Sequence, residues 1–203
     1  MRRFSLKLRG TWLVLLLLML FPASAQAHSD LRMGAFAGGI LHPLEVSAHL
    51  LILLSLGLRL GQYPPFERQM FLAIFAPVAA VALLASAMDR ALSVPQPLLL
   101  GIALGTAALV SSGISTPPWV NRTLLILAAL GIGLDSSPGG TPAMITAKVL
   151  FATWVCLLVV IGYIAFYVSL LPSRKWLQIG VRILGSWIVA ISLLMLAFYF
   201  KKR

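Results

Sequence analysis

All three histidines of the chain, with two of its five acidic residues, lie in one stretch of 25 residues, 27–51. Within that stretch His42, Glu45 and His49 stand three and four residues apart. Because an α-helix turns by about 100° per residue, a continuous helix would place the three side chains in a stripe about 60° wide. Ionisable side chains in an apolar segment usually face a cavity or a bundle interior. We therefore predict that this polar seam, defined as His42, Glu45 and His49, is a functional site.

The polar seam has the chemistry of a transition-metal site. An imidazole and a carboxylate one turn apart can share an ion, and they suit nickel, cobalt or zinc better than copper(I). His42 and His49 would lie about 10.5 Å apart along the axis, too far for one ion to touch all three groups. The spacing predicts two overlapping sites that share Glu45, or a relay of an ion or proton along the helix. A buried hydrogen-bond network with a structural role is the other interpretation.

Three further residues are candidate metal ligands. If a signal peptide is removed after Ala27, His28 offers an imidazole and a free amine, with Asp30 nearby. Asp135 follows an apolar segment and is expected on the same side of the membrane as His42, where it would complete the mouth of the site. A solvated terminus and a turn residue are the alternative interpretations of these positions.

The composition predicts a membrane protein. The chain of 203 residues is 60% hydrophobic and 10% charged, with a mean hydropathy of +0.99. Soluble domains are about 45–50% apolar and about 25% charged. The formal net charge is +11, but the basic residues are scattered between apolar runs without an aromatic-interleaved patch, so we expect no nucleic-acid partner. The expected partner is the lipid bilayer, and the sequence leaves open a homo-oligomer or a larger membrane complex.

The first 27 residues predict a secretory signal peptide. A basic start precedes an apolar core from Trp12 to Phe21, and the segment ends in "PASAQA", with Ala25 and Ala27 at the −3 and −1 positions of a cleavage site. The apolar core is short for a membrane span, which favours cleavage over an uncleaved first helix.

The rest of the chain, 28–203, predicts a single all-α domain, a polytopic bundle of six transmembrane helices. Breaks of Pro, Gly and charge divide it into apolar stretches near 35–60, 67–88, 95–113, 118–135, 143–171 and 177–200. At about 1.5 Å per residue most of these stretches are long enough to cross a hydrocarbon core of about 30 Å. The connections are short and rich in turn residues, which leaves no room for an extramembrane domain.

The signal peptide and the basic residues predict an orientation in the bacterial inner (plasma) membrane. We expect the mature amino terminus in the periplasm and the carboxyl terminus in the cytoplasm. Nine basic residues then lie on the inner side and three on the outer side, in line with the positive-inside rule. The nine are Arg59, Arg68, Arg122, Arg174, Lys175, Arg182, Lys201, Lys202 and Arg203, and the three are Arg32, Arg90 and Lys148.

The stretch "HPLEVSAHLL", together with a signal peptide that ends in Ala-His, resembles the HupE/UreJ family of hydrogenase and urease accessory membrane proteins. The resemblance implies a small polytopic protein with a cleaved signal, of a kind regarded as nickel or cobalt permeases. The chain departs from the family pattern, with Ala48 in place of an aspartate before the second histidine and Leu157 in place of a histidine in the fifth span. Glu45 is the substitute carboxylate in this comparison.

Two functions follow from these residues. The first is a permease or facilitator for nickel or cobalt, with the ion held transiently and no tightly bound cofactor. The second is a non-transporting accessory subunit or assembly factor that docks to a larger membrane complex. A transporter predicts polar side chains from other helices along the seam, whereas a docking subunit predicts an apolar interior. We expect no enzymatic activity, since no serine stands in a nucleophile motif near the histidines.

Overall fold

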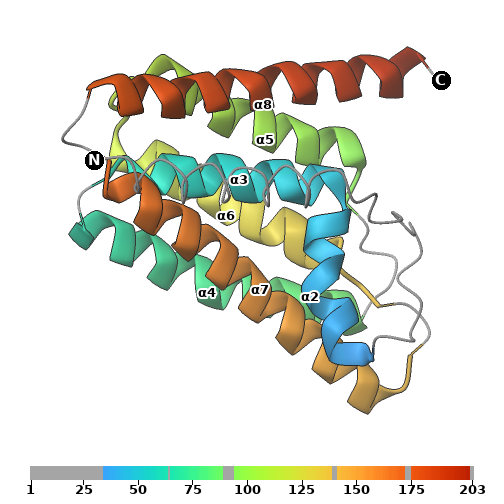
Figure 1. The fold of residues 1–203 in the computed structure, drawn as a ribbon. Coiled ribbons are helices and arrows are strands. Elements are labelled where there is room, and N and C mark those ends of the chain that lie inside the picture. Colours follow the sequence, from blue (N-terminus) through green and yellow to red (C-terminus); the bar gives the residue numbers. More distant parts are fainter. Residues whose placement is uncertain (1–33, 64, 89–93, 139–140, 172–174, 202–203) are drawn as a thin grey trace, which may run out of the picture.

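The computed structural model describes residues 34–63, 65–88, 94–138, 141–171 and 175–201, which form helices without strands (Figure 1). This confirms the all-α prediction, while the predicted signal peptide lies outside the described residues. The helices are α2 (Ala35–Glu45), α3 (Ser47–Gly61), α4 (Pro65–Met88), α5 (Gln96–Ser112), α6 (Pro118–Leu134), α7 (Ala143–Ser169) and α8 (Lys175–Lys201).

Proline and glycine set several of the helix ends. Pro95, Pro117 and Pro142 immediately precede α5, α6 and α7, since a proline tolerates the first turn but not a helix interior. Gly113 ends α5 with a φ of 65°, in the left-handed region that glycine adopts without strain. These breaks are the reason why the helices match the apolar stretches of the sequence closely.

Several helices are long and apolar enough to cross a membrane. In the described part of the chain α4, α7 and α8 meet this condition, and α2 with α3 is a fourth candidate if the bent pair counts as one span. Helices α5 and α6 are apolar but have 17 residues each, about 25 Å. The chain is therefore built as a membrane protein, and the number of six spans stays a prediction.

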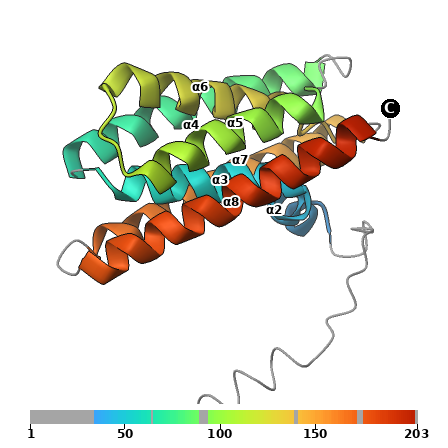
Figure 2. The same ribbon diagram turned by 90° about the horizontal axis from the view of Figure 1, so that it is seen from above.

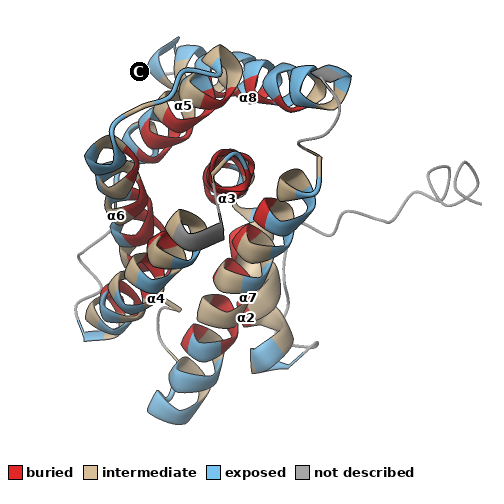
Figure 3. Cartoon of the chain, turned by 90° about the vertical axis from the view of Figure 1, so that its left-hand side faces the viewer, coloured by how far each residue is buried: buried red, intermediate tan, exposed pale blue. Residues whose placement is uncertain are grey.

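Helix α3 lies at the centre of the bundle. Figure 3 shows it end-on and largely buried, with the other helices around it. Twelve of its fifteen residues are buried, as expected for a helix that is apolar on all sides. Helix α8 lies along the outside, mainly against α5 (Figures 1 and 2). The central helix carries a buried His49 near its start and a buried Arg59 near its end. We call the two ends of the bundle the histidine end and the arginine end after these residues.

The described helices do not place the start of α2 and the end of α8 on opposite sides of the bundle, as the predicted orientation requires. Consecutive segments run in opposite directions, so α8 ends at the histidine end, where α2 begins (Figures 1 and 2). An even number of crossings returns a chain to its starting side. Lys201, the last described residue, therefore lies at the histidine end and not with the inner group predicted from the sequence. The orientation of the bundle in the membrane stays a prediction.

The first apolar stretch is not one continuous helix. It breaks at Val46, whose φ of −76° and ψ of 106° are extended, and α2 and α3 meet at an angle of 76°. Pro43 lies inside α2, although a proline is normally tolerated only in the first turn of a helix. Pro43 lacks the N–H that would bond to the carbonyl of Gly39, and the hydroxyl of Thr153 in α7 donates to that carbonyl instead, at 2.9 Å.

Thr153→Val should lower the free energy of unfolding by about 1 kcal/mol, because the Gly39 carbonyl would be buried without a donor. The cost should fall in a Pro43→Ala background, where the restored N–H supplies a donor from within α2. Thr106→Val is the matched control, since the buried hydroxyl of Thr106 donates to Ile102 of its own helix at 2.9 Å. Unfolding in detergent gives the free energy of unfolding of all four variants. If Thr153→Val lowered this free energy equally in both backgrounds, the Thr153 hydroxyl would not be the substitute donor for the missing N–H of Pro43.

Candidate metal site

His42 and His49 meet at the bend between α2 and α3. His42 lies in the last turn of α2 and His49 in the first turn of α3. Their ring centroids are 5.8 Å apart, with an interplanar angle of 72°. The bend therefore brings the two imidazoles much closer than the two helical turns that a straight helix would put between them.

His49 is held by a carboxylate from a distant part of the chain. Its Nε2 lies 3.1 Å from Oδ2 of Asp135, the residue that caps the end of α6. The side chain of His49 is fully buried, whereas that of Asp135 is 25% exposed. An ionised carboxylate only accepts hydrogen bonds, so Nε2 is the donor to such a group, and the corresponding neutral tautomer of the imidazole has its lone pair on Nδ1. Asp135 thus lies at the histidine end, as its place in the sequence suggested.

Two imidazole nitrogens at the bend are buried without a hydrogen-bond partner. They are Nδ1 of His49 and Nε2 of His42. Buried polar atoms normally have a partner, so each exception calls for an explanation. Metal-bound histidines commonly donate their other ring N–H to a carboxylate, which fixes the ring and raises its basicity. His49 and Asp135 have this arrangement, with Nδ1 as the free ligand atom.

The three residues of the polar seam do not lie in one stripe, because the bend separates Glu45 from His49. Glu45 is the last residue of α2 and is exposed, so the prediction that it shares a stripe with both histidines is wrong. The physical reason is the extended backbone at Val46, which ends the 100° progression between Glu45 and His49. The other two candidate ligands, His28 and Asp30, lie outside the described residues.

The described residues hold no group of three or more His, Cys, Asp and Glu side chains arranged to bind a metal ion. The site at the bend therefore offers two imidazoles, with Asp135 behind one of them. A metal ion bound there would take its remaining ligands from water. A small ligand number suits transient binding better than permanent storage.

An apolar layer separates the histidine end from the arginine end. Ile52, Leu53 and Leu56 of α3 pack in the same core as Phe75 and Ile161 of the surrounding helices. The buried hydroxyls of Ser55 and Thr106 donate to carbonyls of their own helices. The described side chains thus form no continuous polar route along α3.

A second polar cluster lies at the arginine end and was not predicted. Arg59 is 4% exposed, and its guanidinium donates to six oxygen acceptors, none of them a carboxylate. They are those of Asn121, Gln62, Leu109, Tyr63, Ile114 and Thr116. An arginine within the apolar run "LILLSLGLRLG" was the available signal, because ionisable residues inside a span are rare and usually functional.

No family model, curated protein or solved structure matches this chain. The resemblance to the HupE/UreJ family therefore stays a prediction, and the site must be judged by its own geometry.

Asp135→Asn should weaken nickel or cobalt binding by about 10- to 100-fold, the usual cost of losing a carboxylate behind a ligating histidine. The variant keeps the side-chain volume but removes the charge that orients and polarises His49. Calorimetric titration of the purified protein measures the change. An unchanged affinity would mean that His49 does not bind through Nδ1.

Proposed function

We propose that this protein binds a divalent transition-metal ion, nickel or cobalt, between His42 and His49 and carries it across the membrane. One observation carries the proposal: two buried imidazole nitrogens without partners lie on rings 5.8 Å apart, with a carboxylate behind one ring. Neutral imidazole is a good ligand for both metals.

The position of the site supports transport. Ion sites of secondary transporters are typically formed where a membrane helix is discontinuous, because the chain ends at the break supply polar groups and can move. Here the break at Val46 joins α2 and α3 at 76°. Asp135, whose side chain is 25% exposed, places a negative charge at the same end, and this charge attracts cations to the site.

The apolar layer along α3 means that transport would require a rearrangement of the helices. An ion held at His49 meets Ile52, Leu53 and Leu56 before it reaches Arg59, a distance of about 15 Å along the helix. A fixed pore would need a polar lining, so we propose that the helices around α3 rearrange to open this layer, with the ion bound at the bend in the closed state. The chain contains no phosphate-binding loop of the Walker type, so transport would be passive or gradient-driven.

The apolar layer is the interior expected of the second candidate function, a non-transporting accessory subunit, and not of a transporter with a fixed polar path. A membrane accessory subunit that receives a metal ion without transporting it needs the histidine site but no route past Ile52. Its apolar interior would resemble the one observed. In this function the ion enters and leaves at the histidine end, and the bundle serves as a rigid holder for His42 and His49.

Influx into proteoliposomes separates the two functions. Purified protein is reconstituted, and nickel or cobalt uptake is followed with an enclosed metal-sensitive dye, for the wild type and for a His42→Gln/His49→Gln variant with the same fold by circular dichroism. Saturable influx that the variant lacks is the expected result. Binding without influx would favour the accessory function, and neither binding nor influx would overturn both.

A further inference from the structure

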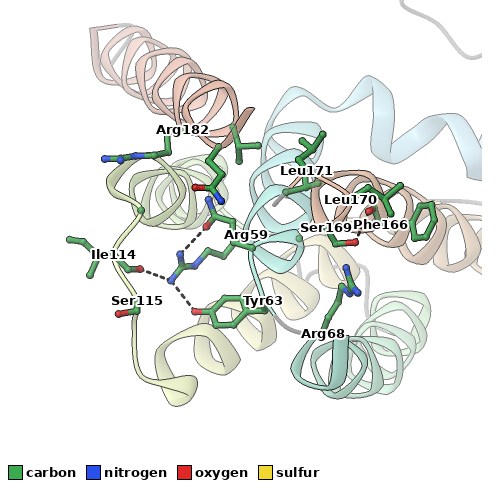
Figure 4. Close-up of a pocket in the computed structure, with 16 residues that line it drawn as sticks. Arg59, Tyr63, Arg68, Ile114, Ser115, Phe166, Ser169, Leu170, Leu171 and Arg182 are labelled. Atoms are coloured by element: carbon green, nitrogen blue, oxygen red, sulfur yellow. Dashed lines mark hydrogen bonds between the residues drawn. The ribbon is translucent and has the colours of Figure 1, made fainter. Parts of the chain in front are cut away.

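A cavity of about 810 Å³ lies at the arginine end, opposite to the histidines. It is bounded by the end of α3, the start of α4, the end of α7, part of α8 and the connection between α5 and α6 (Figure 4). Because α3 and α7 end there and α4 begins there, we expect the cavity at the level where lipid headgroups meet the membrane core. None of the residues assigned to the metal site lines it.

Three arginines line the cavity, and none of its lining residues is Asp or Glu. They come from three different helices: Arg59 from α3, Arg68 from α4 and Arg182 from α8. In the view of Figure 4, Arg59 lies between the other two. The nearest acidic residue in sequence is Glu67, which is not part of the lining. The cavity therefore has a strong positive charge without a carboxylate to balance it.

The helix dipoles do not balance this charge. Three helices end at this side of the bundle (α3, α5 and α7) and three begin there (α4, α6 and α8). A helix end carries about half a negative charge at its carboxyl terminus and about half a positive charge at its amino terminus, so the six ends cancel approximately. The charges of the three arginines remain.

The three arginines have different roles. The five N–H groups of Arg59 are used by its six oxygen acceptors, so it contributes charge but no free donor. Arg68 donates to the carbonyl of Ala165, and Arg182 donates to those of Ser111 and Ser112. Within the described part of the chain these bonds leave donors of Arg68 and Arg182 for a ligand.

The remaining lining is largely apolar. Ile114, Phe166, Leu170, Leu171 and Val181 contribute to it. A small inorganic anion would leave these side chains against an empty or wet volume. A molecule with an anionic head and a hydrocarbon tail would satisfy both parts of the lining.

We propose that this cavity binds a phosphate group, carried by an anionic phospholipid, with Arg68 and Arg182 as the contacting residues and Arg59 as a fixed charge. Arginine matches phosphate through paired N–H donors, and basic pockets between membrane helices bind lipid headgroups in this way. The proposal concerns the end of the bundle away from His49, and its test involves no metal.

The test uses purified, delipidated protein and native mass spectrometry. The protein is titrated with short-chain phosphatidylglycerol, with phosphatidylcholine of the same chain length, and with inorganic phosphate. We expect phosphatidylglycerol to bind about tenfold more tightly than phosphatidylcholine. Arg68→Gln/Arg182→Gln should weaken phosphatidylglycerol binding about tenfold or more. Arg122→Gln is the matched control, since Arg122 is at the same end but does not line the cavity.

A second pair of substitutions keeps the test informative if the glutamine variant unfolds. Arg68→Lys/Arg182→Lys retains both charges but loses the paired donors, so its affinity should lie between those of the wild type and the glutamine variant. Equal binding of the two lipids by the wild type, or equal losses in the cavity variant and the Arg122 control, would overturn the proposal. If the protein bound inorganic phosphate through these arginines but did not bind phosphatidylglycerol, the proposal that a phospholipid carries the phosphate group would be wrong.

Discussion

His49→Gln should weaken nickel and cobalt binding by more than about a hundredfold, because it removes a direct ligand, and even a group behind a ligand is worth about 10- to 100-fold. Glu45→Gln should change the affinity by no more than about threefold, since an exposed carboxylate acts on the site only through screened charge. Calorimetric titration of both variants against the wild type measures the two effects.

This pair of variants distinguishes the observed site from the polar seam of the sequence. If α2 and α3 formed one straight helix, Glu45 would belong to both overlapping sites, and Glu45→Gln would be as damaging as His49→Gln. The break at Val46 ends the stripe that would join Glu45 to His49, and it brings His42 to His49 instead. A large loss in Glu45→Gln, with the fold retained, would contradict the bend as the basis of the site.

Arg59→Met should lower the free energy of unfolding by about 2–4 kcal/mol. The substitution leaves the buried Oδ1 of Asn121 without this donor, as well as partly buried acceptors such as the carbonyl of Ile114. An orphaned buried group costs about 1–3 kcal/mol. Part of this cost is offset, because the variant no longer keeps a charge away from water. Thermal unfolding in detergent provides the measurement.

Two further variants separate the hydrogen bonds of Arg59 from its charge. Arg59→Lys keeps the charge but has three donors instead of five, so its stability should lie between those of the wild type and Arg59→Met. Arg122→Met should have little effect, since Nε of Arg122 is buried without a partner. If Arg59→Met were as stable as the wild type, the network at the arginine end would not hold α3 to the connection between α5 and α6.

The helices were predictable because local signals determine them. Apolar stretches bounded by residues such as Pro95, Pro117 and Gly113 gave the helical segments within a few residues. The break at Val46 was not predictable in the same way. Pro43 was the visible signal, but its missing N–H is compensated by Thr153, which lies 110 residues away in sequence, so the helix continues through the proline. Only the packed bundle contains this compensation.

The two polar clusters were predictable to different degrees. The residue types of the metal site stood out in the sequence, and the alternation of segments put Asp135 on the same side as His42. Which histidine it would contact depends on the packing of α6 against α3, across 86 residues of sequence. Arg59 was visible as a charge in an apolar run, but its partners Asn121 and Thr116 look like ordinary turn and helix-start residues until the fold brings them to α3.

X-ray absorption at the cobalt edge tests whether His42 and His49 bind the ion, because it reports which ligand atoms surround the bound cobalt. The protein loaded with one equivalent of cobalt is compared with His42→Gln, His49→Gln and Glu45→Gln. We expect two imidazoles among the direct ligands of cobalt in the wild type, one in each histidine variant and two in Glu45→Gln. A first shell without imidazole, or one that His49→Gln leaves unchanged, would contradict it.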